Sequence, residues 1–300
     1  MKLFAPKYYK DFSCIAEKCT HNCCIGWEID IDPDSAKKYN ALDSGYGKNI
    51  KNSIGMSEVP HFVLEENKRC PHLDENGLCK IICELGEEYL CRICREHPRF
   101  YNDFLKGKEV GLGMACEEAA RIILSSDEYD VIEHIGDLCG ECCNIGIDTH
   151  EYRKEIYSIL KNDSIPYDDR LHAIYERFDI SPHIFEDAKW HEIIEELEYL
   201  DAAHKELFLS YSSLEKTPKE IDEISERALA YFIYRHCTCA FDYEEYLAML
   251  GFCLFLERLF VSVYISESDI TPEVIGRIIS EEIEYSPENT QRIINELYFW

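Results

Sequence analysis

The sequence predicts a mainly α-helical protein, in which an irregular, cysteine-rich, metal-binding N-terminal half packs on a C-terminal helical bundle or array. Two observations carry this prediction. Ten of the sixteen cysteines precede residue 120, among turn-prone segments such as DSGYGKN and DENG. From about residue 117 onward, apolar residues recur at i, i+3, i+4 and i+7, the spacing of one helix face. We therefore expect a metal-cluster region over residues 1–125 and a helical region over residues 126–300.

The composition excludes several classes of protein. A chain of 300 residues forms one large domain or two ordinary ones, and 46% apolar residues suffice for a core. The formal net charge is −28, from 31 basic and 59 acidic side chains. Such a surface repels phosphate backbones, which argues against nucleic acids and anionic membranes as partners. It suits a lysine-bearing protein partner, although only weakly.

The compartment expected from the sequence is the cytoplasm. The opening MKLFAPKYYK lacks the apolar core of a secretory leader. The most apolar stretch, LAMLGFCLFLERLFVSVYI, is interrupted by Glu257 and Arg258, so it is expected to be a buried helix rather than a membrane span. Cysteines in a reducing compartment seldom form a disulfide framework, which leaves metal binding as the leading explanation for the clustered ones.

In the first half, residues 34–41 are expected to form a short helix capped by Asp34 or Ser35. Residues 59–66 are expected to form a strand. The loop between Cys70 and Cys79 should turn at Asn76-Gly77, a dipeptide suited to a hairpin.

In the second half, eight segments have helical spacing, and Thr271-Pro272 and Ser286-Pro287 mark helix starts with proline at the first helical position. There is no βαβ alternation. The pair Gly111 and Gly113 lacks the strand–turn–helix context of a cofactor loop, so it is weak evidence for one.

The cysteine spacing itself indicates a thiolate metal centre. The first run is C-x4-C-x3-C-C, followed by CPHLDENGLC, C-x2-CREHPRF and MACEEAAR. One zinc ion takes four ligands and one cubane cluster takes four thiolates or fewer. The set therefore serves one cluster with spare thiols or two sites. Because adjacent side chains cannot easily bind one small ion, Cys23 and Cys24 point to different metals, or one of them is a structural thiol.

These motifs, CIAEKCTHNCCIGWEIDID, CPHLDENGLCKI, GEEYLCRICREHPRF and MACEEAARIIL in that order, resemble the flagellin lysine-N-methylase family. That family belongs to the wider group of CxxxCxxCC-type zinc- or iron-chelating proteins. The resemblance implies transfer of a methyl group from S-adenosylmethionine to lysine side chains of flagellin. It also implies an iron–sulfur centre, expected to be 4Fe–4S, or a zinc centre. The cysteines that match the family motif are Cys14, Cys19, Cys23, Cys24, Cys70, Cys79, Cys94 and Cys116.

Several residues near the motif have no assigned role. Cys83 and Cys91 fall outside it and are spare thiols or substitute ligands, and Cys139, Cys142 and Cys143 are a further site or incidental thiols. His21 and His97 lie close enough in sequence to the cysteines to be ligands or to donate to them. The aromatic side chains near the motifs could hold a sulfonium or ammonium group or simply form the core: Trp27, Phe100, Tyr101 and Phe104.

The sequence leaves the catalytic residues and the donor pocket unassigned. The leading hypothesis is a metal-dependent protein-lysine N-methyltransferase. Two alternatives remain open: a non-catalytic metal or iron–sulfur-binding protein, and a protein in which zinc only replaces a core in the irregular half.

Overall fold

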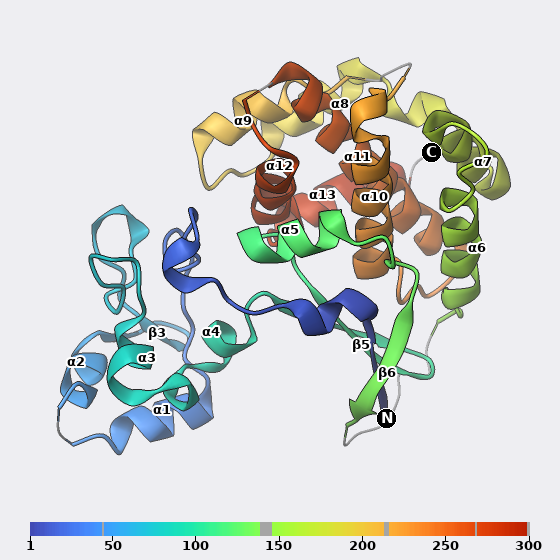
Figure 1. Cartoon of the computed structure of the whole chain (residues 1–300). Helices are drawn as coiled ribbons and strands as arrows, with labels where there is room; N and C mark the ends of the chain where they lie inside the picture. Colours follow the sequence, from blue (N-terminus) through green and yellow to red (C-terminus); the bar gives the residue numbers. More distant parts are fainter. Residues whose placement is uncertain (44, 139–145, 213–215, 268, 299–300) are drawn as a thin grey trace. The chain divides into compact units, whose positions relative to one another are not determined.

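The computed structural model describes the chain except for residues 44, 139–145, 213–215, 268 and 299–300. The chain divides into two compact units (Figure 1). Residues 1–12 and 100–300 form the first, here the helical unit, and residues 13–99 form the second, here the cysteine unit. Each is described by itself.

The prediction of a mainly α protein is confirmed, since thirteen α-helices lie in the described part of the chain. The helical unit contains α5 (Glu117–Ser125), α6 (His150–Leu160), α7 (Tyr167–Phe178), α8 (Asp187–Glu196), α9 (Ala202–Phe208), α10 (Asp222–His236), α11 (Tyr243–Ser266), α12 (Pro272–Ile279) and α13 (Pro287–Leu297). A π-helical turn, Ser280–Glu284, joins α12 to α13.

The helical unit also holds a four-stranded sheet that the sequence did not predict. Its order is β4 (Arg99–Phe104), β5 (Gly107–Leu112), β1 (Lys2–Pro6) and β6 (Ile132–Asp137). Strand β1 is parallel to β5, with Phe4 opposite Glu109, and antiparallel to β6. This pairing draws the first residues into the helical unit, so the compact units do not follow the boundary expected near residue 125.

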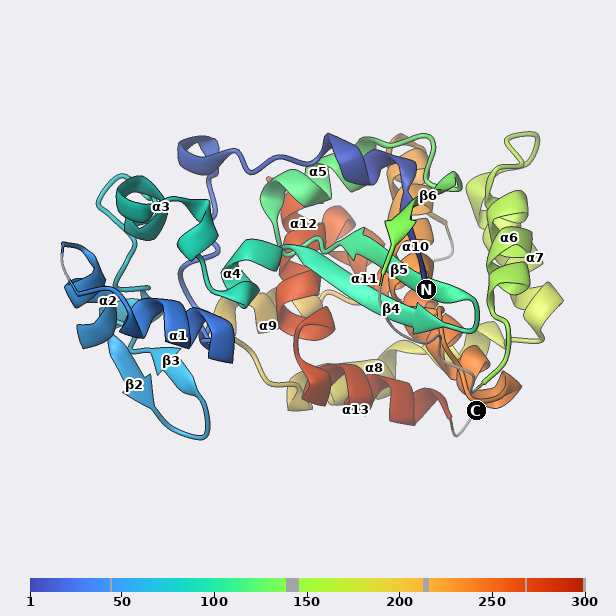
Figure 2. The ribbon, with the colours of Figure 1, turned by 90° about the horizontal axis from the view of Figure 1, so that it is seen from below.

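The core of the helical unit is built around α10 and α11, which lie side by side (Figure 1). The hairpin β4–β5 runs beside α10 in Figure 2. Two hydrogen bonds attach it there, from Tyr234 Oη to Val110 O (3.1 Å) and from Asn102 Nδ2 to Arg235 O (2.7 Å).

Helix α11 is the apolar stretch that the sequence analysis expected to be a buried helix. By length and composition alone it could cross a membrane. Its most apolar window is 78% buried inside the structure, which is how the central helix of a folded core is packed. The packing therefore agrees with the expectation, and Glu257 lies within this buried helix.

The cysteine unit has short elements around a small core. They are α1 (Pro33–Asn40), α2 (Gly47–Asn52), β2 (Ile54–Met56), β3 (Pro60–Phe62), α3 (Lys80–Leu85) and α4 (Arg92–Glu96). The core is formed by Ile29, Ile31, Tyr39, Ile50, Phe62, Cys70, Leu73, Ile81 and Cys91. A core this small leaves room for metal binding to contribute to its stability.

The helix, strand and hairpin turn expected in the first half are present, but the helix cap and the length of the strand differ from the prediction. Helix α1 is capped by Asp32, whose carboxylate accepts from Ser35 N (3.0 Å), rather than by Asp34 or Ser35. The expected strand is reduced to β3, paired with β2. Gly77 has a φ of +79°, and Leu73 pairs antiparallel with Cys79, as the expected hairpin requires.

Candidate functional site

The structure distributes the eight candidate metal ligands over both units. Seven belong to the cysteine unit: Cys14, Cys19, Cys23, Cys24, Cys70, Cys79 and Cys94. Cys116 belongs to the helical unit, at the start of α5, where it packs against that unit's core. Cys14 and Cys23 are exposed, Cys70 is buried, and the others are half-buried. The eight-cysteine set stays a prediction.

Several cysteines of the cysteine unit lie next to one another. Cys70 N donates to Cys24 O (2.8 Å), which holds those two segments together. The sulfurs of Cys91 and Cys94 are 3.4 Å apart. The thiol of Cys24 donates to Cys23 and lowers the pKa of Cys23 to about 7, whereas burial is the main cause that raises the pKa of Cys70 to about 11.

These residues are the donor types that a soft metal prefers, but their side chains are not arranged around one ion. In the described residues, no three or more His, Cys, Asp or Glu side chains are arranged to hold an ion. The donors fit zinc or an iron–sulfur cluster, because both prefer thiolates. His97 supports the same chemistry: its buried Nε2 has no hydrogen-bond partner in the described part of the chain. Burial lowers the pKa of His97 to about 4, so the ring is neutral, the form that binds metals.

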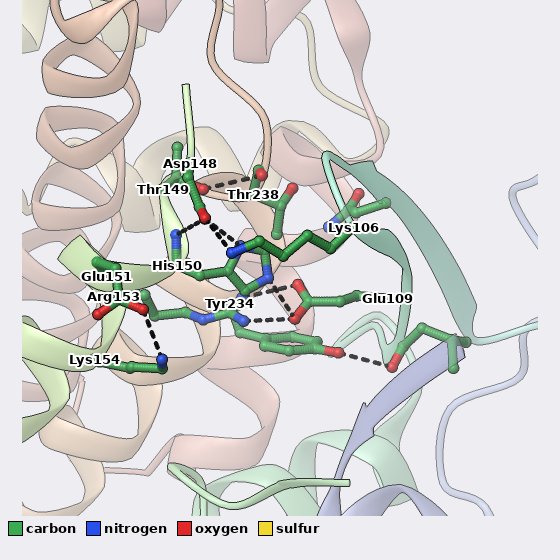
Figure 3. Close-up of polar contacts among 12 residues, drawn as sticks. Lys106, Glu109, Asp148, Thr149, His150, Glu151, Arg153, Lys154, Tyr234 and Thr238 are labelled. Carbon is green, nitrogen blue, oxygen red and sulfur yellow. Dashed lines mark hydrogen bonds and ion pairs between the residues drawn. The ribbon is translucent and has the colours of Figure 1, made fainter. Parts of the chain in front are cut away.

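A second polar cluster lies in the helical unit (Figure 3). Glu109 on β5 accepts two hydrogen bonds from Arg153 on α6, at 2.8 Å and 2.5 Å. His150 Nε2 lies 3.1 Å from Glu109 Oε1, and its Nδ1 lies 3.5 Å from Asp148 Oδ1. Lys106 in turn donates to Asp148 Oδ2 (2.6 Å). We call these residues the Glu109 network.

The sheet and the first turn of α6 position the Glu109 network. Its central carboxylate and guanidinium are buried, at 1% and 4% exposure for Glu109 and Arg153. Burial alone would raise the pKa of Glu109, but hydrogen bonds from Arg153 and His150 outweigh it and hold this pKa near 2. The carboxylate is therefore ionised and fully paired, so it binds α6 to β5 rather than accepting a proton.

A third cluster surrounds the π-helical turn. Glu284 accepts from Tyr231 Oη (2.9 Å), and His236 Nε2 is 2.7 Å from its other oxygen. The guanidinium of Arg235 lies over the rings of Phe100 (4.9 Å) and Tyr285 (4.6 Å). π-Helical turns are frequent at functional sites. Here the turn directs the fully buried carboxylate of Glu284 at α10. The positive charge of Arg235 neutralises it.

Glu257 is a buried carboxyl group whose pKa is raised. It is 1% exposed, accepts from Tyr167 Oη (3.0 Å), and its Oε2 has no partner among the described residues. Burial raises the pKa of Glu257 to about 7, so this carboxyl group titrates near neutral pH. It lies inside the core, away from solvent.

Two of the aromatic candidates, Phe100 and Phe104, pack against other rings. Phe104 stacks on His150, with ring centroids 4.2 Å apart, and Phe100 packs on Tyr234. Gly111 is required by this packing, because a Cβ there would lie 2.4 Å from Phe100 Cζ. Gly111 thus makes room for a ring rather than for a cofactor. Cys139, Cys142 and Cys143 lie outside the described residues.

Sequence reasoning missed both charged networks. In a chain with this many acidic residues, Glu109 and Glu284 look like solvated charges. The available signal was Glu109 within the apolar run around GKEVGLGMA, where a charge needs a buried partner. The partners, Arg153 and Arg235, are far away in sequence, so only the folded chain identifies them.

Together, the fold and the thiols define a mainly α-helical protein with a second compact unit that carries seven of the eight candidate cysteines. Residues 105–299, which lie within the helical unit, match the family described as the FliB lysine N-methylase C-terminal domain. The chain belongs to this family, which confirms the resemblance found in the sequence.

Curated relatives agree with the family. The chain is 30% identical over 132 residues to the flagellar biosynthetic protein FliU of Salmonella muenchen, covering 41% of this chain and 77% of that protein. It shows the same identity to the lysine-N-methylases of Salmonella choleraesuis and Salmonella typhimurium. The match covers 32% of their length, so the chain spans about a third of each. No solved structure matches the chain.

Proposed function

We propose that this protein is a protein-lysine N-methyltransferase that uses S-adenosylmethionine as donor and flagellin as substrate. The observation that carries the proposal is the family match over 105–299, because it covers most of the helical unit. The relatives named lysine-N-methylase and flagellar biosynthetic protein support the reaction and the substrate class. The net charge of −28 favours a substrate that presents lysines.

The reaction sets clear demands on the chain. A lysine amine must be neutral, desolvated and aligned with the sulfonium carbon before it can displace the methyl group. The carboxylates of Glu109 and Glu284 are already neutralised by arginines, so they are structural groups in this proposal. They keep β5, α6 and α10 in fixed positions around which a substrate can be aligned.

The metal centre belongs to the proposal as well. The thiols of the cysteine unit would hold an iron–sulfur cluster or a zinc ion, and His97 is a nitrogen donor close to Cys94 in sequence. A bound metal would supply the cross-links that such a small core lacks. The protein's own residues, and not the metal, are expected to exclude water from the amine.

The test is methyl transfer by full-length protein purified without oxygen. It would be incubated with purified flagellin and methyl-labelled S-adenosylmethionine, and hydrolysed flagellin would be examined for ε-N-methyllysine by mass spectrometry. We expect label in lysine only. The control is flagellin whose lysines have been acetylated, which should remain unlabelled.

Metal analysis of the same protein separates the alternatives. Iron with matching sulfide, but no methyl transfer to flagellin, would favour a non-catalytic iron–sulfur protein. Stoichiometric zinc without methyl transfer would favour a structural zinc protein. Methyl transfer that persists after complete metal removal would show that the centre has no direct part in the reaction.

A further inference from the structure

His236, the last residue of α10, is held by a buried carboxylate through one of its two ring nitrogens. Its Nε2 lies 2.7 Å from Oε1 of Glu284 in the π-helical turn. Its Nδ1 makes no hydrogen bond to any residue that the structure describes. The ring stands edge-on against Phe252, with centroids 5.0 Å apart and planes at 87°. The imidazole is therefore oriented by two contacts that leave one nitrogen for another group.

The charges around His236 favour a neutral ring with its proton on Nε2. Burial opposes ionisation of Glu284, but Arg235 and the hydrogen bond from His236 lower its pKa to about 2. An ionised carboxylate only accepts hydrogen bonds, so Nε2 carries the proton and Nδ1 the lone pair. Burial is the main cause that lowers the pKa of His236; Arg235 acts in the same direction, and Glu284 opposes them. From α11 the ring meets the uncharged Phe252.

The imidazole of His236 can be reached from solvent. Its side chain is 14% exposed, whereas that of Glu284 is 0% exposed. Because Nε2 points at this fully buried carboxylate, the accessible part of the ring lies on the side that carries Nδ1. A neutral imidazole that is oriented in this way is the common form of a general base in enzymes.

Two other histidines of the helical unit contact carboxylates of low exposure, and the fold explains both. The two ring nitrogens of His150 each face a carboxylate of the Glu109 network. His204 contacts Glu282 (2.5 Å), whose carboxylate also accepts from the two backbone N–H groups that precede α9. The pair of His204 and Glu282 therefore fixes the start of that helix, and it supplies a matched control for His236.

We propose that His236 is the general base that removes a proton from the substrate lysine, and that Glu284 is the positioning residue that orients it. The inference deepens the proposed methyl transfer and rests on it. One N–H proton of the lysine ammonium moves to Nδ1 of His236. The lone pair released on the amine forms the new N–C bond to the methyl group, and the electron pair of the broken C–S bond stays on the donor's sulfur. His236 then gives the proton to water.

The test measures methyl transfer from S-adenosylmethionine to purified flagellin by the full-length parent and His236→Gln. Glutamine can still donate to Glu284 but has no basic nitrogen. We expect kcat at pH 7 to fall by about 10²–10⁴-fold, the usual contribution of a general base, with little change in KM. The control His204→Gln alters the other histidine–carboxylate pair of the same turn and should keep the parent kcat.

The pH profile separates a base from a residue that only supports the fold. Without His236 the lysine loses its proton to solvent, so kcat of His236→Gln should rise roughly tenfold per pH unit above pH 7, while the parent changes little. Glu284→Gln should show a similar rise, because its amide can donate to Nε2 and so place the ring proton on Nδ1. A parent-like profile in Glu284→Gln would overturn its positioning role.

The outcomes distinguish the inference from the proposed function. Parent kcat in His236→Gln would overturn the inference and leave the proposed function standing. A loss by the same factor at every pH, or an equal loss in His204→Gln, would also overturn it, because either result is that of a structural residue. A parent that transfers no methyl group to flagellin would overturn the proposed function, and the inference with it.

If His236→Gln does not fold, chemical modification of the parent decides. Diethyl pyrocarbonate acylates neutral imidazole nitrogens, and mass spectrometry of the digested protein locates the label. Flagellin should protect His236 from this reagent, while His183, whose side chain is 85% exposed, should be labelled as before. Labelling of His236 that flagellin does not slow would refute its contact with the substrate lysine.

Discussion

Replacing Arg153 by methionine tests whether burial is the reason that the Glu109 network stabilises the fold. The substitution keeps most of the side-chain volume but removes both hydrogen bonds to Glu109. The carboxylate, at 1% exposure, would then keep His150 as its remaining hydrogen-bond partner among the described residues. Removing one partner of a buried ion pair costs about 3–5 kcal/mol, because the other charge remains without compensation.

The chain offers a matched control at the surface. Arg177 binds Glu155 through two hydrogen bonds of 2.6 Å and 2.8 Å, but the two side chains are 42% and 40% exposed. Exposed pairs of this kind contribute at most about 1 kcal/mol. Arg177→Met should therefore have a small effect, although the bond geometry is nearly the same.

Urea unfolding and thermal unfolding, both followed by circular dichroism, measure the stability of the two variants. For a unit of this size, a loss of 3–5 kcal/mol corresponds to a fall in Tm of roughly 6–20 °C. The double variant Glu109→Met with Arg153→Met should regain much of the loss, since a buried pair replaced by apolar groups is often neutral. Equal losses for Arg153→Met and Arg177→Met would refute the argument from burial.

The contribution of Glu109 to stability should depend on pH in one definite direction. Because the pKa of Glu109 falls from 4.5 to about 2 in the folded state, its ionised form stabilises the fold above pH 4.5. That contribution is lost as the pH falls from 4.5 toward 2. The difference between the parent and Arg153→Met should therefore be largest near pH 7 and shrink below pH 4.5. A constant difference over this range would contradict the assigned ionisation.

Two further predictions concern the helical unit. Because burial raises the pKa of Glu257 to about 7, folded protein keeps a proton that unfolded protein releases, and stability should fall by roughly 3 kcal/mol between pH 4.5 and 7. Glu257→Gln should remove this part of the slope in urea unfolding at pH 5 and pH 8, and an unchanged slope would contradict the prediction. Gly111→Ala should destabilise by about 1–3 kcal/mol, since its Cβ would meet Phe100, whereas Gly136→Ala, with nothing within 4 Å, should have little effect. Equal melting temperatures for these two variants would show that Phe100 moves aside without strain.

The local elements were accessible from the sequence because their signals are short-range. The prolines at 272 and 287 begin α12 and α13 as expected, and the apolar stretch around residue 250 forms the buried helix α11. A helix start depends on a cap and a proline within one turn, so a single sequence is enough to find it.

The sheet could not be predicted from local sequence signals. Strand β1 pairs with β5 and β6, both more than one hundred residues later, and these pairings bring it into the helical unit. Each strand is short, and alternation over five or six residues is a weak signal. The expected boundary near residue 125 depended on cysteine density, which does not reveal where backbone hydrogen bonds are made.

By itself, the sequence determined the mainly helical class, the family and the presence of clustered thiols, since these follow from local spacing and motif order. Only the tertiary structure decided which charges are buried, that Arg153 pairs with Glu109, and that Cys91 lies beside Cys94 while Cys83 is exposed. Burial and pairing are properties of segments brought together by folding. They set the pKa of each group and the geometry of each ligand, and no local pattern encodes them.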